Sequence, residues 1–428
     1  MAQPAAAFLS RDFVRYQLAR VVVIIGAEAQ ALAVAWQVYQ ITHRAIDLGY
    51  TGLMLFLPGL LFILPAGHVA DRFDRRHVIL VCYTLQAFCS AVLFRFAWTG
   101  IDQVWPIFAL LFVIGTGRAF SGPASSALVP HLVPQEHFVN AITWGSAIFQ
   151  IANIVGPALG GILFTLPLHE RLHGASLVYL CSLGSIIWFL ALVGSLQVRP
   201  GRMEHRAISK DVILAGFRYV ASTQVLLGSI SLDLFAVLLG GAVALLPIFA
   251  QEILHAGPRG LGLLRAAPAL GALAVSLWLM IQPIRKRAGA KMLICVAIFG
   301  AATVVFGLSK SLPLSLAALF VVGASDMVSV VIRASVLQLA TPAEMRGRVS
   351  AVNSLFIGAS NELGEFESGL TAQWWGAVRA VVFGGIGSLV ITGLWAAFFP
   401  SLRRADALTP EALVNAGFEQ TGQEVRKL

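Results

Sequence analysis

The sequence predicts an all-α membrane protein with twelve transmembrane helices in two six-helix halves. Three observations lead to this fold class: the composition, the recurrence of long apolar runs, and an internal repeat. Hydrophobic residues make up 58% of the 428 residues and charged residues only 12%, with a mean hydropathy of +0.81. An ordinary soluble domain carries about 25% charged residues. The composition therefore excludes a soluble globular protein.

Apolar runs of about twenty residues recur along the chain, and each is long enough to cross a hydrocarbon layer of about 30 Å as a helix. The runs are continuous rather than alternating, which favours helices over a membrane β-barrel. The twelve expected spans are 16–41, 48–70, 77–99, 105–128, 140–166, 174–197, 223–252, 260–283, 290–309, 313–340, 348–374 and 378–400.

The longest polar connection lies between the sixth and seventh spans. It carries several Arg and Lys residues, with apolar residues at helical spacing between them. Such a pattern is typical of an amphipathic helix at a membrane surface. The expected organisation is an N-terminal segment 1–15, a six-helix half 16–197, a linker 198–222, a second six-helix half 223–400 and a C-terminal tail 401–428.

The net charge of +9 is compatible with a nucleic-acid partner, but the distribution of the charge argues against one. Most of the 30 Lys and Arg residues fall in the loops that a cytoplasmic N-terminus would place inside the cell. This is the positive-inside pattern of membrane proteins. We therefore expect both termini to be cytoplasmic, the lipid bilayer and a small-molecule substrate to be the partners, and the protein to be a monomer.

The sequence also contains an internal repeat. A shift of 208 residues, which carries Arg118 onto Asp326, aligns the fourth and fifth spans with the tenth and eleventh. The same shift pairs Gly156 with Gly364. Because each half has six spans, both halves begin on the same side, and the repeat is parallel. Repeats of this kind favour transport by alternating access around a site between the halves, although a repeat kept only for packing is the alternative.

The loop between the second and third spans carries a distinctive motif. It begins with Gly67, continues with Asp71 and Arg72, and ends with Arg75 and Arg76. This order resembles the signature loop of the major facilitator superfamily. The resemblance implies that these five residues form a conformational latch. The alternative is that the bases only anchor the loop on the inner side of the membrane.

Further motifs agree with the same superfamily. Arg118 resembles its basic motif in the fourth span, and Gly156, Pro157, Gly160 and Gly161 resemble its antiporter motif in the fifth span. The small residues of the latter permit close helix approach, and the proline removes a backbone donor. We interpret this motif as a packing element that permits rocking, not as a ligand site.

The resemblance covers the whole chain and implies the major facilitator fold. The acid-rich stretch 361–369 and the residues 71–76 look most like the bacterial branch that includes the enterobactin exporter and related drug-efflux proteins. This branch implies a protein of the bacterial inner membrane that works as an exporter.

Charged residues within the spans are the candidate functional residues, because a charge near the bilayer centre is costly and is normally paired or functional. The candidates for proton coupling or substrate binding are Glu28, Arg118, Asp233, Asp326, Asn361, Glu362 and Glu365. Desolvated carboxylates can exchange protons near neutral pH, as coupling requires. Static ion pairs are the alternative, and Arg118 and Asp326 occupy symmetric positions suited to pairing. Arg333 lies near a span end, where we expect it to snorkel to the interface.

One further motif is dismissed. His169, Glu170 and His173 match the zinc-binding H-E-x-x-H pattern, but they occupy a short loop with no third ligand in view. No phosphate-binding or nucleophile motif is present. The sequence therefore predicts no metal site, no cofactor other than a proton gradient as energy source, and no enzymatic activity.

These observations together predict a proton-coupled antiporter that exports a small amphipathic organic molecule, siderophore-like or drug-like. A lipid or lysolipid flippase of the same fold is the first alternative. A non-transporting membrane sensor or scaffold is the alternative from another class.

Overall fold

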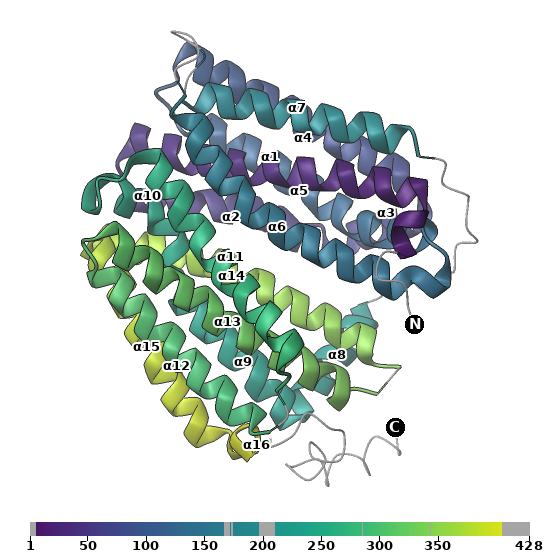
Figure 1. Ribbon diagram of the computed structural model, residues 1–428, viewed down its shortest axis with the longest axis vertical. Coiled ribbons are helices and arrows are strands. Elements are labelled where there is room, and N and C mark those ends of the chain that lie inside the picture. Colours follow the sequence, from purple (N-terminus) through teal and green to yellow (C-terminus); the bar gives the residue numbers. More distant parts are fainter. Residues whose placement is uncertain are drawn as a thin grey trace. The chain divides into compact units, whose positions relative to one another are not determined.

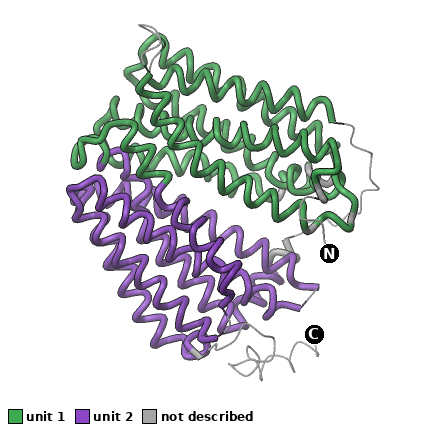
Figure 2. The backbone as a smooth tube through the Cα atoms, viewed as in Figure 1, with its two compact units in different colours: residues 1–208, 250–266 green, residues 209–249, 267–428 purple. Residues whose placement is uncertain are grey.

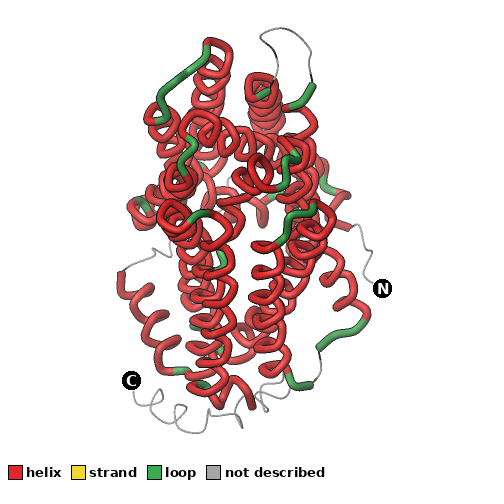
Figure 3. The backbone as a smooth tube through the Cα atoms, turned by 90° about the vertical axis from the view of Figure 1, so that its left-hand side faces the viewer, coloured by secondary structure: helices red, strands yellow, loops and turns green. Residues whose placement is uncertain are grey.

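The computed structural model describes residues 6–166, 172, 174–196, 210–284, 286–342 and 344–404, and excludes the side chains of residues 6, 7, 64, 70, 71, 135, 139, 210–213 and 404. In this part of the chain all regular structure is helical (Figures 1 and 3). The all-α class predicted from the apolar runs is confirmed.

The long helices are α1 (Arg11–Thr42), α2 (Ala45–Leu61), α3 (Ile63–Arg72), α4 (Arg75–Thr99), α5 (Trp105–Leu128), α6 (Phe138–Phe164), α7 (Ala175–Gly194), α8 (Lys210–Ser222), α9 (Gln224–Leu239), α11 (Gly257–Ile281), α12 (Ala288–Leu308), α13 (Leu312–Ala340), α14 (Arg346–Trp375) and α15 (Ala377–Phe398). Short helical segments are η1 (Ala6–Leu9), η2 (Val129–His131), η3 (Gln135–His137), η4 (Ala242–Leu245), α10 (Leu246–Ile248), the π-helical η5 (Phe249–Ile253) and α16 (Pro400–Arg404).

Among the described residues, ten helical stretches are long and apolar enough to cross a membrane. The two remaining expected spans differ for separate reasons. The second span is interrupted, so its apolar helix α2 has only 17 residues. The eleventh span forms α14, which has 30 residues but contains three glutamates. Many large apolar side chains of the membrane helices are exposed, as lipid-facing side chains are. Met280 and Ile281 of α11, for example, are each 80% exposed.

The second span breaks at Phe62, between α2 and α3. Pro65 explains the break, because its nitrogen carries no hydrogen to donate to the carbonyl of Leu61. The seventh span breaks in a similar way after Leu239. Gly240 and Gly241 follow α9, and a Cβ on Gly241 would lie only 2.6 Å from the carbonyl oxygen of Gly364 in α14. A side chain at this position would therefore separate α9 from α14.

The chain divides into two compact units (Figure 2). Unit 1 contains residues 1–208 and 250–266, and unit 2 contains residues 209–249 and 267–428. Each unit has its own apolar core. The boundaries predicted for the two six-helix halves stay a prediction. The segment 250–266 belongs to unit 1, although it lies within the expected second half 223–400.

Contacts within unit 1 hold this segment. The Tyr39 hydroxyl of α1 donates a hydrogen bond to Oε1 of Glu252. Arg259 Nε donates to Oγ1 of Thr165 at the end of α6, over 2.7 Å. Gly262 of α11 approaches α6 so closely that a Cβ on it would lie 2.6 Å from the carbonyl oxygen of Pro157.

The internal repeat is visible in how glycines pack within each unit. In unit 1, Gly115 of α5 faces the backbone of α2, while in unit 2 its counterpart Gly323 of α13 faces the backbone of α11. Gly156 of α6 faces α1, and its counterpart Gly364 of α14 faces α9. Equivalent helices therefore pack in equivalent ways, as the parallel repeat predicts.

The linker and the tail are described in part. α8 packs on unit 2, where the Tyr219 hydroxyl donates to the carbonyl of Ala340 over 2.8 Å. A Cβ on Gly216 of α8 would lie 2.8 Å from the carbonyl oxygen of Arg348 in α14. The first tail residues form α16, and Leu402 is fully buried in the core of unit 2. Linker residues 198–209 and tail residues 405–428 lie outside the described part.

Candidate functional site

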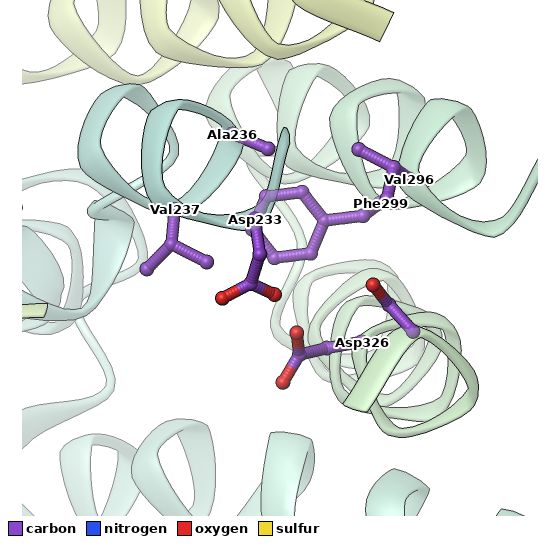
Figure 4. Close-up of a pocket in the computed structure, with 7 residues that line it drawn as sticks. Asp233, Ala236, Val237, Val296, Phe299 and Asp326 are labelled. Atoms are coloured by element: carbon purple, nitrogen blue, oxygen red, sulfur yellow. The ribbon is translucent and has the colours of Figure 1, made fainter. Parts of the chain in front are cut away.

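A small pocket that contains two carboxylates lies inside unit 2, between α9, α12 and α13 (Figure 4). It has room for about one water molecule. The lining residues are Asp233, Ala236, Val237, Val296, Phe299, Asp326 and Ser329. Two of the acids predicted from their depth in the spans therefore share one pocket.

Helical spacing explains why these side chains meet. Asp233 lies three and four residues before the two α9 positions that line the pocket, so all three share one face of α9. On α13, Asp326 and Ser329 are three residues apart, and Arg333 follows four residues later on the same face. Figure 4 shows the Asp233 and Asp326 carboxylates on neighbouring walls of the pocket.

The pocket has an internal counter-ion. Arg333 Nη1 forms a buried ion pair with Oδ2 of Asp233, and the two side chains are 4% and 6% exposed. Asp326 is close enough to interact electrostatically with both partners. It forms no ion pair of its own among the described residues. With both carboxylates ionised, the three groups carry one excess negative charge.

Ser329 adds a hydrogen-bonding group that is not satisfied within the described structure. The residue is 1% exposed, and its Oγ has no hydrogen-bond partner. A buried polar atom left without a partner costs about 1–3 kcal/mol. The hydroxyl is therefore available to a water molecule or a ligand group that enters the pocket.

The predicted antiporter motif brings α6 against α1 beside Glu28. A Cβ on Gly156 would lie 2.5 Å from Cβ of Glu28, and one on Gly160 would lie 2.8 Å from Cα of Ala29. Gly161 faces α11 instead, and a Cβ on it would lie 2.6 Å from the carbonyl oxygen of Pro258. Pro157 lies within α6 between these glycines. The motif acts as a packing surface, and Glu28 is partly exposed beside it.

The acids of α14 lie outside the pocket. Glu362 and Glu365 are partly exposed, and Asn361 is exposed. Neither glutamate lines the pocket. α14 nevertheless packs on α9 through Gly364, where an added Cβ would lie 3.0 Å from the carbonyl oxygen of the pocket residue Val237. Their role in proton coupling stays a prediction. Arg118 is exposed on α5 in unit 1, and its expected pairing with Asp326 is likewise untested.

The residues of the predicted latch lie at the α3–α4 junction of unit 1. Arg76 donates a hydrogen bond to the carbonyl of Gly194 at the end of α7, and Arg75 contacts Nε2 of His131. Arg72 is exposed and Gly67 is buried. The side chain of Asp71 lies outside the described part, as do His169, Glu170 and His173 of the dismissed zinc pattern.

Two site residues escaped the sequence reasoning. The expectation that Arg333 snorkels to the interface is wrong, because α13 continues for seven residues beyond it and its guanidinium is buried against Asp233. A single serine in an apolar span does not indicate a site. The spacing of positions 326, 329 and 333 on one helical face does predict that Ser329 and Arg333 lie beside Asp326.

The comparisons with known proteins agree with this fold. Residues 2–421 match the transmembrane secretion effector family, a branch of the major facilitator superfamily. The chain belongs to this family. It is thus a multi-pass membrane protein of the transporter type, and the superfamily predicted from the motifs is confirmed.

Several members of the superfamily are similar to the chain over most of its length. The enterobactin exporter EntS of Citrobacter koseri is 26% identical over 87% of this chain and 84% of its own. The multidrug efflux pump Tap of Mycolicibacterium fortuitum is 26% identical over 88% of this chain and 92% of its own. These relatives are exporters and pumps by name, in agreement with the expectation that the protein is not an enzyme.

Other similarities are shorter or concern the fold alone. The transporter YkuC of Bacillus subtilis is 30% identical, but the alignment covers only 37% of this chain and 36% of the relative. The macrolide efflux protein A of Streptococcus pyogenes is likewise matched over about a third of its length, 35%. The crystal structure of a bacterial homologue of the lysosomal transporter Spinster has a TM-score of 0.70 at 14% identity, over 95% of this chain and 98% of that one.

Proposed function

We propose that the protein is a proton-coupled antiporter that exports a small amphipathic organic molecule by alternating access. The observation that carries this proposal is the pocket of unit 2, which is lined by Asp233 and Asp326, with Arg333 paired to Asp233. Charged groups inside membrane helices are typical of proton relays and substrate paths.

The charges in the pocket assign different roles to the two acids. Asp233 is compensated by its ion pair with Arg333, whereas Asp326 shares that cation without pairing to it. One proton on Asp326 makes the three groups neutral. Asp326 is therefore the proton acceptor in this proposal, and Ser329 holds the water molecule that delivers the proton. Glu28, Glu362 and Glu365 remain further candidates for proton or cation binding, with Arg118 modulating them.

The relatives support the direction of transport. EntS and Tap are named as an exporter and an efflux pump, and each aligns with more than four fifths of this chain. By this similarity the cargo is a siderophore-like or drug-like molecule. We further propose a monomer in the bacterial inner membrane with both termini cytoplasmic, powered by the proton gradient without a cofactor.

Uptake into inverted membrane vesicles tests the proposal, because export from the cell becomes uptake in this orientation. Lipophilic cations, macrolides and siderophores are offered with and without an imposed pH gradient. We expect gradient-dependent accumulation of at least one compound. Absence of such accumulation for the whole panel contradicts the antiporter, and gradient-independent movement of labelled phospholipid supports a flippase instead.

The pocket is tested with Asp326→Asn and a matched control. Asp47 is also a buried carboxylate, 5% exposed, but it lies in α2 of unit 1 and is 3.6 Å from Arg44. We expect Asp326→Asn to abolish the dependence of transport on the pH gradient and Asp47→Asn to preserve it. An unchanged pH profile in Asp326→Asn removes this residue from the coupling mechanism.

A further inference from the structure

A second polar cluster lies in unit 1, where α1 packs on α6. Gln17 and Arg20 are three residues apart on one face of α1, and both point toward Gly145 of α6. A Cβ on Gly145 would lie 3.1 Å from Nη1 of Arg20 and 3.5 Å from Nε2 of Gln17. Because Gly145 has no side chain, the guanidinium and the amide converge on its backbone.

The amide of Gln17 has no partner in the described structure. The residue is 2% exposed, and neither Nε2 nor Oε1 forms a hydrogen bond. Buried side-chain polar atoms are nearly always satisfied, because an unsatisfied one has lost its hydrogen bonds to water without gaining others. A glutamine with both atoms unsatisfied is therefore unfavourable unless a ligand supplies the missing donor and acceptor.

Arg20 supplies a positive charge beside this amide. It is partly exposed, so a ligand can reach its guanidinium, and it forms no ion pair with a carboxylate among the described residues. Its electrostatic neighbours are the hydroxyl groups of Tyr16 and Tyr83. The two acids of α1, Asp12 and Glu28, are each eight residues from Arg20 in the sequence; Asp12 is 3.6 Å from Arg15, and Glu28 lies beside the Gly156 position of α6. The charge of Arg20 is thus uncompensated within the described part.

The two side chains define the chemistry of a ligand. A guanidinium binds a carboxylate through two parallel hydrogen bonds. The glutamine amide offers a donor at Nε2 and an acceptor at Oε1. A ligand group that binds the guanidinium, Nε2 and Oε1 together must carry an anionic oxygen with a hydroxyl next to it. A 2-hydroxycarboxylate or a catecholate has this arrangement, whereas a lipid phosphodiester has no hydroxyl on its phosphorus.

We propose that Gln17 and Arg20 form a binding subsite in unit 1 for an anionic oxygen with a neighbouring hydroxyl group. The subsite rests on the proposed export function in one respect, because the cargo would carry this group. Arg20 binds the anionic oxygen, Gln17 Nε2 donates to it, and Gln17 Oε1 accepts from the hydroxyl.

Binding to the purified full-length protein tests the subsite without any pH gradient, so the result is independent of the antiport hypothesis. The probe is 2-hydroxybenzoate, followed by the shift of the thermal unfolding temperature and by isothermal titration. We expect saturable binding to the wild type, and affinities at least about tenfold weaker in Arg20→Gln and Gln17→Leu, since hydrogen bonds to a charged group contribute about 1.5–3 kcal/mol.

Three controls distinguish this subsite from binding elsewhere on the protein. Arg15→Gln removes an equal charge from the same end of α1 and should bind as the wild type does. The neutral 2-hydroxybenzamide should bind at least about tenfold more weakly than the acid. Without ligand, Gln17→Leu should unfold at the same or a higher temperature than the wild type, because it removes an unsatisfied amide.

Several results would overturn the proposal. Equal affinity of 2-hydroxybenzoate for the wild type and Arg20→Gln would place the binding elsewhere. Binding of inorganic phosphate alone would identify a phosphate site, and stabilisation only by nanodiscs containing phosphatidylglycerol would identify a lipid site. A lower unfolding temperature of free Gln17→Leu would show that the amide has a structural partner.

Discussion

At the residue scale, the acidic pocket depends on the pairing of Arg333 with Asp233. Both side chains are nearly inaccessible, so removal of either partner leaves a charge without compensation in an apolar core. Breaking a buried pair in this way typically costs about 3–5 kcal/mol. The pair therefore links the stability of unit 2 to the chemistry of its pocket.

We expect Arg333→Gln to lower the unfolding temperature of the purified protein strongly, and the double variant Asp233→Asn/Arg333→Gln to recover part of the loss. The recovery follows because the double variant no longer buries the Asp233 carboxylate without its counter-ion. The control is Arg95→Gln, since Arg95 is exposed on α4 and its loss should change stability by less than about 0.5 kcal/mol. A double variant as unstable as the single one would contradict this interpretation of the pair.

Asp74 provides a pH-dependent contribution outside the membrane spans. It caps α4, and its Oδ1 accepts a hydrogen bond from the backbone N–H of His77 over 3.1 Å. Partial burial opposes ionisation of this carboxyl, but the hydrogen bonds from the backbones of His77 and Arg76 outweigh it and lower its pKa. The stabilisation is therefore present above the pKa of the unfolded chain and is lost as the pH falls through the lowered one.

We expect Asp74→Ala to lose about 0.5–1 kcal/mol of stability at neutral pH, because helix caps contribute roughly this amount. Asp74→Asn retains a capping oxygen and should stay close to the wild type. Unfolding temperatures of the three proteins between pH 3 and pH 7 check this expectation. The wild type should approach Asp74→Ala as the pH falls, whereas a constant difference would exclude the carboxylate as the cause.

The candidate residues could be predicted from the sequence only in part. Depth in a span identifies Asp233 and Asp326 as costly charges, but it does not reveal which side chains meet. Their meeting depends on the rotation of α9 and α13 about their axes. The interfacial position predicted for Arg333 is wrong because it considered only the distance from the span end. The helical face that Arg333 shares with Asp326 places it inside unit 2.

At the element scale, helices approach each other closely where glycines replace side chains. At Gly160, α6 lies so close to α1 that an added Cβ would be 2.8 Å from Cα of Ala29. Gly184, in the interior of α7, has nothing within 4 Å of that position. The two glycines therefore offer a matched pair for separating packing from helix propensity.

We expect Gly160→Ala to destabilise the protein by about 1–3 kcal/mol, because the new methyl group overlaps Ala29. Gly184→Ala should be neutral or stabilising by up to about 1 kcal/mol, the difference in helix propensity. Thermal unfolding in the same detergent compares the two. Equal effects would mean that α6 can move away from α1 without cost.

Hydropathy predicts where the elements lie better than where they break. A window of about twenty residues averages over Pro65 and over Gly240 with Gly241, so both interrupted spans look continuous in such a window. The breaks follow from backbone chemistry, since proline has no N–H and glycine permits a close approach. The proline and the glycine pair are both visible in the sequence, and they indicate the breaks when the residues are considered one by one rather than as a window average.

At the scale of the whole molecule, the repeat predicted the fold but not the composition of the two units. Apolar patterning shows that the segment 250–266 belongs to membrane helices, but not with which neighbours it packs. That choice is made by individual contacts, such as the hydrogen bond between Tyr39 and Glu252. Contacts between residues so far apart in the sequence leave no periodic signal.

Because the chain passes between the units more than once, the linker is not the only connection. The passages lie at 208/209, 249/250 and 266/267. We expect a protease site inserted after Ile208 to yield two fragments that copurify and retain transport after cleavage. Fragments that separate in mild detergent would contradict this expectation. The uncleaved insertion variant serves as the control.

The segment 250–266 has a mechanical consequence. It is fastened to unit 1, while the chain on both of its sides belongs to unit 2. Any rotation of one unit against the other must therefore be absorbed at its two ends. One end is the π-helical turn Phe249–Ile253, and the other is followed at once by Pro268, which removes a backbone hydrogen bond from α11. We therefore expect the chain to bend at these two weak points of the backbone when the units rotate.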